Sequence, residues 1–573
     1  MESLLLVPVA TYPLSAMLRR KGVGMNFDSF LGNIYFGSMD MERFHSFQDL
    51  EEDEKTREIV SKYLEATKKY PPSYLEQQGT IPAELLEELK KIGYFGLNIP
   101  EKYGGVGLSL RQYLQVVAEI AGKDLALVLI SLAHLSIGCK GIVLFGNEAQ
   151  KEKYLVPAAS GEMIFSYALT EPKIGSDAKH IESKAVLSED GKYYILNGQK
   201  TYITNANYAG GLTVFAQLDS EKPGFMGSFI VETTWDGVKI GKDMPKMGLK
   251  ASSTAAIQFK DVRVPVENLL GQPGEGFKVA MSILNYGRLA LGAGSVGAMN
   301  QSMRDMEKQS ARRRQFGVEI NSFELIQEKM VQAKVDSYVA SAMTAFTAGM
   351  LEDHPQARIA IESSHCKLFG TTRAWNTIYD ALQVAGGSGY LATQPYEKRL
   401  RDFRVTTIFE GTTEIHSIYP PLFVLRNLNK HMKAVHPSTT SKLVFLLKGL
   451  FGKADWKLRF HQRVMNRAAR LAKANGRSVR WLLHAGLLIY GKKIQNEQFF
   501  LRRITNLSLH LYGLVAVLAK IDGAQKMGRD ISEDLRILSY FLEVARQSRK
   551  RDKRLFRSRK EALHKNVAKS IIS

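Results

Sequence analysis

The chain has 573 residues, 45% of them hydrophobic, which is ordinary for a globular protein but too many residues for one hydrophobic core. Its two cysteines, Cys139 and Cys366, belong to no Cys-x-x-Cys motif or His/Cys cluster, so neither a disulfide framework nor a metal site is supported and a reducing compartment fits. The net charge of +21 lies in the tail, because residues 430–573 hold 32 Lys and Arg against 9 Asp and Glu, whereas residues 1–429 hold 46 against 48.

The first 50 residues are predicted to be a leader or arm outside the domains. An apolar stretch from Leu4 to Leu18 is interrupted by two prolines and is shorter than the roughly 20 residues that span a bilayer. Cations follow this stretch at residues 19–21, whereas a secretory signal carries its cations first. We expect an unstructured leader, with a transit peptide or a membrane-touching arm as the alternatives.

Residues 51–161 are predicted to form an N-terminal helical domain. Pro82 stands in a first helical turn, where proline is accepted, and strong helix formers follow it up to Leu89. Apolar residues between Leu114 and Ala121 recur at helical spacing. The glycines of residues 103–107 indicate a loop between these two helices.

Residues 162–276 are predicted to form a middle, β-barrel-like domain, because the apolar period changes to that of strands. The dipeptide Asn197-Gly198 favours a tight hairpin turn between the apolar runs 193–196 and 201–204. Further strands are expected at residues 212–218, 227–232 and 255–264.

Residues 277–430 are predicted to form a C-terminal four-helix bundle, since helical spacing returns over 277–314 and 323–350. Three glycines between Gly292 and Gly297 match the nucleotide fingerprint Gly-x-Gly-x-x-Gly, but no strand precedes them and no βαβ unit surrounds them. We interpret them as small residues that let two helices approach, and a Rossmann dehydrogenase is disfavoured.

Residues 431–573 are predicted to be an extra basic helical domain. Apolar helical stretches at 443–451, 481–490 and 507–521 are each shorter than a transmembrane span and are flanked by Lys or Arg. Such a segment favours an anionic partner, either lipid head groups or an acidic protein, while a solvated basic face stays open. Nucleic acid is not expected, because the basic run 549–554 lacks interleaved aromatic residues. We expect the domain to lie on a membrane surface.

Two short segments carry the candidate chemistry. Residues 167–177 place hydroxyls near Gly175, and hydroxyls and backbone amides are what the edge of a flavin ring needs. Tyr202 could cover a planar ring, although a polar loop and a core tyrosine explain these residues equally well. Glu410 stands between Phe409 and a glycine and could be a base, whereas most Glu-Gly pairs are solvated loop ends. Together the segments indicate oxidation of a carbon-hydrogen bond.

Over residues 50–428 the chain resembles an acyl-CoA dehydrogenase. Five motifs occur in that family's order: Tyr167–Asp177, Gly198–Asn205, Arg313–Gly317, Gln383–Gly387 and Ile408–Ile415. The basic tail resembles the very-long-chain, membrane-associated branch, including its paralogue that serves as an assembly factor of respiratory complex I. The resemblance implies an α+β multidomain fold with the four domains and the leader described above.

The resemblance also implies roles for individual residues. FAD contacts are implied for Tyr167, Leu169, Thr170, Ser176, Tyr202, Thr204, Thr412 and Glu414. Contacts with the FAD of a neighbouring subunit, and hence a homodimer, are implied for Arg313, Phe316, Gln383 and Gly387. The thioester substrate is expected along Ser176, Asn285 and Arg288. Lys173 and Ile174 replace the small residues usual in this loop, which bears on substrate fit.

Glu410 matches the family's catalytic base. Some relatives place the base at the position of Gly287, and glycine cannot serve, so the assignment to Glu410 is strengthened. A glycine there also resembles the long-chain branch, where it leaves depth for an acyl tail.

The expected reaction is abstraction of the α-proton of a long-chain acyl-CoA by Glu410, with hydride transfer to the flavin and electrons passed to an electron-transfer flavoprotein. An acyl-CoA oxidase and a non-catalytic assembly factor acting through the tail are the alternatives. The expected location is a membrane surface, either the matrix side of the mitochondrial inner membrane or the cytoplasmic face of a bacterial membrane.

Overall fold

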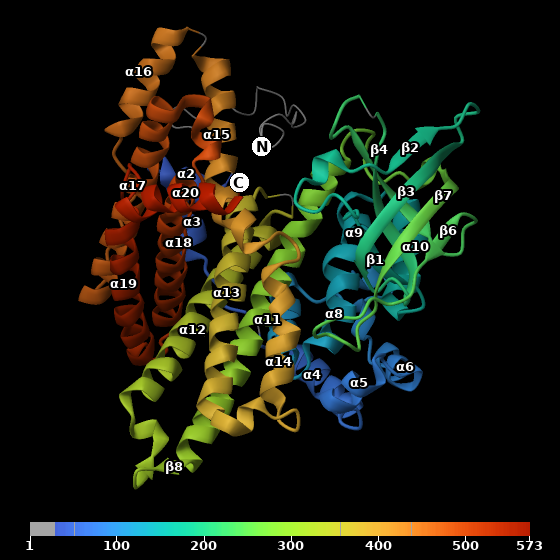
Figure 1. The fold of residues 1–573 in the computed structure, drawn as a ribbon, viewed down its shortest axis with the longest axis horizontal. Coiled ribbons are helices and arrows are strands. Elements are labelled where there is room, and N and C mark those ends of the chain that lie inside the picture. The colour runs from blue at the N-terminus through green and yellow to red at the C-terminus, as the bar shows by residue number, and fades with distance from the viewer. Residues whose placement is uncertain (1–28, 51, 220, 356, 437, 573) are drawn as a thin grey trace.

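The computed structural model describes residues 29–50, 52–219, 221–355, 357–436 and 438–572, so the apolar stretch from Leu4 to Leu18 lies outside the described residues. Long helices make up one half of the molecule and a twisted sheet with short helices makes up the other (Figure 1). The helices of the predicted bundle stand between the sheet and the helices of the basic extension.

Two short helices of the predicted arm, α2 (Phe30–Tyr35) and α3 (Met41–His45), pack against the bundle. Apolar side chains of both helices are buried, and the backbone N–H of Leu31 donates to the buried carboxylate of Glu362 at 2.8 Å. Residues 29–50 are therefore built into the core and are not an unstructured leader.

Seven α-helices follow in the chain before the first strand of the sheet. Their bounds are α4 (Glu54–Thr67), α5 (Pro72–Gln78), α6 (Ala83–Lys91), α7 (Leu110–Ala121), α8 (Leu125–Leu132), α9 (Lys140–Phe145) and α10 (Glu148–Ser160). Helix α4 starts with a capping box in which Asp53 and Thr56 satisfy each other's backbone N–H. Gly104 and Gly107 adopt positive φ, as the predicted loop between helices requires.

The middle domain is a seven-stranded sheet in the order β1-β4-β2-β3-β7-β6, with β5 paired to β4. The strands are β1 (Ile164–Ala168), β2 (Lys184–Leu187), β3 (Tyr193–Thr204), β4 (Ala209–Gln217), β5 (Met226–Glu232), β6 (Val238–Ile240) and β7 (Thr254–Pro265). Buried residues of β3, β4, β5 and β7 form a core of their own inside the curled sheet. The strands predicted near residues 212, 227 and 255 are confirmed.

The predicted hairpin at Asn197-Gly198 is wrong, because these residues lie inside the single long strand β3. Both halves of β3 pair with β7, and the register shifts between Leu196 and Gly198 mark a bulge. The Asn197 side chain fills it by donating to Asp261 Oδ1 at 3.0 Å and accepting the N–H of Asp261 at 2.9 Å. A turn-favouring dipeptide therefore bends a strand here rather than reversing it.

The predicted bundle consists of α11 (Gly276–Arg312), α12 (Glu324–Asp353), α13 (Ala360–Ala385) and α15 (Thr413–Val435), with the short α14 (Pro395–Phe403) beside them. A Cβ at Gly297 would collide with the carbonyl oxygen of Ala118 on α7. The Gly-x-Gly-x-x-Gly run thus permits a close helix crossing, as expected.

The basic extension comprises α16 (Thr439–Leu450), α17 (Arg463–Tyr490), α18 (Gln498–Lys526), α19 (Ser532–Asp552) and α20 (Arg559–Ile572). It is joined to the bundle rather than separate, since His365 Nε2 of α13 lies 2.5 Å from Ser508 Oγ of α18. Two segments, Leu125–Phe145 and Gln498–Lys526, are apolar and long enough to cross a membrane by composition. However, 83% and 89% of their most apolar windows are buried inside the molecule, as in core helices.

Candidate active site

Glu410 lies in the loop between α14 and α15 and faces α11. Its backbone adopts the left-handed region with φ +54°, and Gly411 follows with φ +100°. The carboxylate oxygen Oε2 is buried and has no hydrogen-bond partner among the residues that the structure describes. A carboxylate oxygen that is neither solvated nor hydrogen-bonded is available to bind a proton.

Burial raises the pKa of the Glu410 carboxyl from 4.5 to about 7, against the opposing pull of the Arg288 and Lys367 cations. A base with a pKa near the operating pH combines a useful ionised fraction with a strong tendency to take a proton. The electrostatics of the site therefore suit Glu410 to general-base chemistry at neutral pH.

Gly287 makes room for this carboxylate. A Cβ at Gly287 would lie 2.5 Å from Glu410 Oε1 and 2.7 Å from the side chain of Ile137, closer than real Cβ contacts. Glu410 thus occupies the space that a side chain on α11 would otherwise fill. Position 287 and position 410 compete for one volume, and this chain gives that volume to the carboxylate.

The structure brings several of the predicted residues to Glu410. Arg288 is buried, donates from Nε to the Glu410 carbonyl at 3.5 Å and lies over the ring of Tyr419. Asn285, one turn earlier, accepts a hydrogen bond from Ser363 at 2.9 Å. Burial raises the pKa of Tyr167 well above its ordinary value, and the nearby Glu410 carboxylate adds to this rise. Strand β1, helix α11 and the Glu410 loop therefore meet at one place.

Thr412 and Glu414 flank the same loop. The hydroxyl of Thr412 accepts the N–H of Ile415 at 3.3 Å and so caps α15, whereas Glu414 is exposed. Glu414 lies in the first turn of α15, where the helix dipole favours its negative carboxylate.

The predicted flavin loop after β1 is tied to strand β3. Glu171 and Lys200 form an ion pair at 2.7 Å with side chains no more than 3% exposed. Although burial alone would raise it, the Lys200 ammonium and hydrogen bonds hold the pKa of Glu171 below its usual value. Lys200 also donates to the Leu169 carbonyl at 3.2 Å, and the N–H of Thr201 donates to the Thr170 carbonyl at 2.9 Å. The loop is thereby fixed beside Tyr202.

The surface next to this loop fits a planar, polar cofactor. The Tyr202 side chain is 66% exposed on a bulged part of β3 and its backbone has φ +58°. Ser176 is exposed, and a Cβ at Gly175 would meet no atom within 4 Å. Thr204, further along the strand, is half-buried. An exposed ring beside exposed hydroxyls and open backbone is the donor set that a flavin needs.

The remaining predicted residues lie at the other end of the bundle. Arg313 ends α11, and Phe316 is 94% exposed at the tip of the small hairpin of β8 (Arg314–Gln315) and β9 (Val318–Glu319). Gln383 and Gly387 are exposed at the end of α13. Because Gly287 and Arg313 are 26 residues apart on one helix, the two groups are separated by ~39 Å. One chain does not bring them together (Figure 1).

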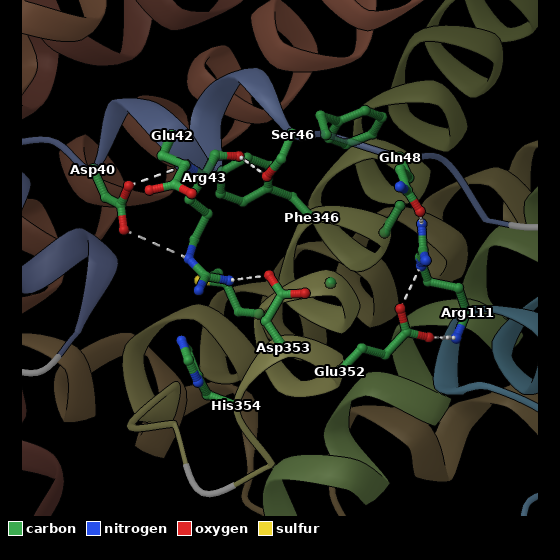
Figure 2. A pocket seen from close by; sticks show the side chains of 14 residues that line it. Asp40, Glu42, Arg43, Ser46, Gln48, Arg111, Phe346, Glu352, Asp353 and His354 are labelled. Carbon is green, nitrogen blue, oxygen red and sulfur yellow. Dashed lines mark hydrogen bonds and ion pairs between the residues drawn. The ribbon is translucent and has the colours of Figure 1, made fainter.

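A cavity of about 480 Å³ lies away from all these residues, between α3 and the end of α12 (Figure 2). Its cations are engaged, since Arg43 pairs with Asp353 at 3.2 Å and Arg111 pairs with Glu352 at 2.5 Å. These pairs join the N-terminal arm and α7 to the bundle. We assign this cavity to the seam between the arm and the bundle and not to the chemistry.

Three residues at the Glu410 loop were not predicted from the sequence: His416 and Lys367 contact the loop, and Ser364 contacts His416. His416 Nε2 lies 3.1 Å from the Glu410 carbonyl, Ser364 Oγ lies 2.7 Å from His416 Nδ1, and Lys367 Nζ donates to the Gly411 carbonyl at 2.6 Å. Ser364 and Lys367 come from α13, far from Glu410 in the sequence, and no motif marks them. Only the position of His416, six residues after Glu410 at the start of a helix, could have drawn attention.

The chain matches the N-terminal, middle and C-terminal domains described for acyl-CoA dehydrogenases at residues 50–162, 166–262 and 274–418. Residues 463–571 match the ACAD9/ACADV C-terminal domain.

Similar proteins cover most of the chain. A human very long-chain specific acyl-CoA dehydrogenase, named as mitochondrial, is 33% identical over 94% of this chain and 86% of its own. A probable acyl-CoA dehydrogenase of Bacillus subtilis is 33% identical over 77% of this chain and 75% of its own. A crystal structure of an acyl-CoA dehydrogenase complexed with FAD from Bacillus anthracis has a TM-score of 0.79, 29% identity and 91% coverage of both chains.

The matches agree with a sheet domain between helical domains, and the similar crystal structure contains FAD. The chain belongs to the acyl-CoA dehydrogenase family and is an FAD-dependent oxidoreductase.

Proposed function

We propose that this protein is a long-chain acyl-CoA dehydrogenase whose catalytic base is Glu410 and which works at a membrane surface as a homodimer. The observation that carries the proposal is the Glu410 carboxylate, buried against Gly287 with a pKa raised to about 7. Dehydrogenation of an acyl-CoA needs one base at the α-carbon and one hydride acceptor at the β-carbon.

The chain supplies the base. As the bond between the α-carbon and its hydrogen breaks, the Glu410 carboxylate takes the proton, and the electron pair stays with the thioester as an enolate-like charge. The carboxyl becomes neutral in this step, which is the form that a buried site favours. The nearby cations Arg288 and Lys367 keep a fraction of the carboxyl ionised beforehand.

FAD, when bound, supplies the acceptor for the hydride that leaves the β-carbon, so the product is a trans-2-enoyl-CoA. The residues proposed to hold it in this subunit come from β1 and the loop after it, from β3, and from the Glu410 loop with the start of α15: Tyr167, Leu169, Thr170, Ser176, Tyr202, Thr204, Thr412 and Glu414. Ser176, Asn285 and Arg288 are proposed to line the substrate path. The ion pair of Glu171 and Lys200 orients the first of these segments.

The proposed dimer rests on the distance between the two groups of residues. Arg313 lies ~39 Å from Gly287 along α11, too far for the two ends of this helix to share a flavin. Phe316 lies in the hairpin that follows Arg313, and Gln383 and Gly387 lie at the end of α13. Phe316 is almost fully exposed in one chain. A second copy would give this ring and Arg313 a cofactor to contact, namely the FAD of the partner subunit.

The proposed membrane surface is helix α16. Its exposed apolar side chains Leu443, Leu447 and Phe451 recur every four residues and so share one face. Phe451 is 83% exposed, and Lys448 and Lys453 lie among these residues. An apolar face bordered by cations is typical of a helix that lies in the head-group region of an anionic membrane. Figure 1 shows α16 at one extremity of the molecule, where a flat surface could reach it.

The word mitochondrial in the name of the human relative supports a mitochondrial location. There the surface in question would be the matrix side of the inner membrane, and in a bacterium it would be the cytoplasmic face of the cell membrane. We propose an electron-transfer flavoprotein as the acceptor of the electrons, because a dehydrogenase must be reoxidised by a partner at each turnover.

Anaerobic flavin bleaching with a ladder of acyl-CoA chain lengths tests the function. We expect bleaching that is fastest with long chains, followed by faster reoxidation with electron-transfer flavoprotein than with oxygen. Rapid reoxidation by oxygen would instead identify an oxidase. Absence of bleaching with every chain length, in protein that retains FAD, would overturn the enzymatic proposal.

A further inference from the structure

The loop that carries Glu410 is held through its backbone carbonyls by three buried donors. His416 and Arg288 contact the carbonyl of Glu410 at 3.1 and 3.5 Å, and Lys367 donates to the carbonyl of Gly411 at 2.6 Å. His416 and Lys367 have no exposed surface. The carboxylate oxygen Oε2 has no hydrogen-bond partner among the described residues, so the loop is fixed through its backbone while this oxygen stays available for a proton.

The hydrogen bonds define the tautomer of His416. A carbonyl oxygen only accepts, so Nε2 carries the hydrogen and donates to Glu410. Nδ1 is therefore the acceptor, and the hydroxyl of Ser364 donates to it at 2.7 Å. Burial, together with the cations of Arg288 and Lys367, holds the pKa of His416 well below its usual value. The ring is thus a neutral, oriented donor.

We infer that His416, oriented by Ser364, is a positioning residue that holds Glu410 in the conformation from which its carboxylate reaches the substrate. This inference rests on the proposed role of Glu410 as the base. His416 contacts neither carboxylate oxygen, so it acts through the backbone of the base.

The conformation that is held is an unusual one. A residue with a side chain adopts φ near +54° at a cost in free energy and persists there only where its surroundings enforce it. The next residue repeats the constraint, because a Cβ at Gly411 would lie 2.7 Å from His416 Nε2. Without the donor, we expect Glu410 to relax toward ordinary φ values, which turns the carboxylate away from Gly287.

The neighbouring residues of α13 support the same reading. One turn of α13 makes three contacts: Ser363 with Asn285, Ser364 with His416, and Lys367 with Gly411. This turn therefore contacts both the proposed substrate path and the region of the Glu410 loop. Because α13 is a long core helix, this turn is a rigid support.

The test compares His416→Leu with His416→Gln. Leucine removes the donor at similar volume, whereas the amide nitrogen of glutamine can occupy the place of Nε2 and donate to the same carbonyl. Because a displacement of ~1 Å of a reacting group costs about 10²-fold in rate, we expect His416→Leu to lower kcat by about 10- to 100-fold. KM and FAD content should stay near wild type, and His416→Gln should recover most of kcat.

A second readout reports the base alone. Exchange of the substrate α-proton in D₂O without an electron acceptor should fall in His416→Leu in proportion to kcat. Ser364→Ala keeps the imidazole but removes the hydroxyl that orients it, so kcat and the rate of exchange should both fall less than in His416→Leu. This variant replaces His416→Leu in the test if the leucine variant does not fold.

Wild-type kcat and exchange in both His416→Leu and Ser364→Ala would overturn the inference, and so would equal losses in His416→Leu and His416→Gln. A wild-type enzyme that bleaches with acyl-CoA separates these results from a failure of the proposed function. If wild-type protein loaded with FAD bleaches with no acyl-CoA, the proposed function and this inference fall together.

Discussion

The Glu410 site and the basic extension use charge in opposite ways. At Glu410, one carboxylate faces the two buried cations Arg288 and Lys367, and burial raises its pKa to about 7. In residues 430–573, 32 cations against 9 carboxylates are spread over helices, many of them solvated. A buried charge interacts strongly with its neighbours because water does not screen it. Exposed charges interact weakly one by one, and salt screens their combined field. Single substitutions should therefore matter greatly in the first region and little in the second.

The largest effect is expected for Glu410→Gln. The amide is close in shape but cannot take a proton, so the rate of flavin bleaching by acyl-CoA should fall at least 10²- to 10⁴-fold. FAD absorbance per protein should be unchanged. Glu189→Gln, which alters an exposed carboxylate of the middle domain, is the matched control and should keep wild-type rates. Normal bleaching in Glu410→Gln would show that another group is the base.

Gly287→Ala is expected to be next in size. The added Cβ lies 2.5 Å from Glu410 Oε1, so the carboxylate must move, and a shift of ~1 Å costs about 10²-fold. Gly294→Ala is a control on the same helix, because its Cβ would find no atom closer than 3.6 Å. Stopped-flow bleaching of the two variants measures the difference. Equal rates for both would mean that the carboxylate does not need its place against α11.

The pH dependence of the rate should reveal the raised pKa. The base works ionised, so kcat/KM should rise with pH and level off above about 7, the pKa of Glu410. The Lys367 cation lowers that pKa, so Lys367→Met should move the rising limb to higher pH. Lys184→Met, an exposed change on β2, should leave the limb in place. A limb that moved to lower pH in Lys367→Met would contradict the electrostatic account.

The smallest effect on catalysis is expected from the extension. Leu447→Asp and Phe451→Asp should each weaken binding to anionic vesicles by about 10- to 100-fold, since burying such a side chain is worth about 1.5–3 kcal/mol. Bleaching by a short, soluble acyl-CoA should not change. Val567→Asp, on the exposed face of α20, is the comparison that tests whether α16 is specific. Binding should weaken with salt. Unchanged binding in both α16 variants would place the contact elsewhere.

Local patterns in the sequence predicted the elements well where one feature dominates. The helical spacing of α11 and α12, the alternation of β4, β5 and β7, and the small residues at Gly297 each reflect a short-range rule. Glu410 was predicted as the base from the upstream flavin-like segment, the order of the family's motifs and the glycine at position 287, and its raised pKa suits that prediction.

The wrong predictions concern segments whose conformation depends on contacts with residues far away in the sequence. Asn197-Gly198 has the chemistry of a hairpin turn, but pairing with β7 on both sides keeps the chain extended and turns the dipeptide into a bulge. Residues 29–50 were predicted to belong to a leader or arm. In the structure they are folded, and the N–H of Leu31 donates to Glu362, more than 300 residues away in the sequence. Propensity cannot register such contacts because their partners are not local.

The sequence by itself determined the succession of domains, the carboxylate at position 410 and the glycine at position 287, because residue type and spacing are written in the chain. Only the tertiary structure decided that these two positions share one volume, that His416 contacts the Glu410 carbonyl and Ser364 contacts His416, and that burial raises the pKa of Glu410. Each of those facts depends on which helices exclude water from one point. The exclusion of water depends on how several segments pack together, so no single segment of the chain determines it.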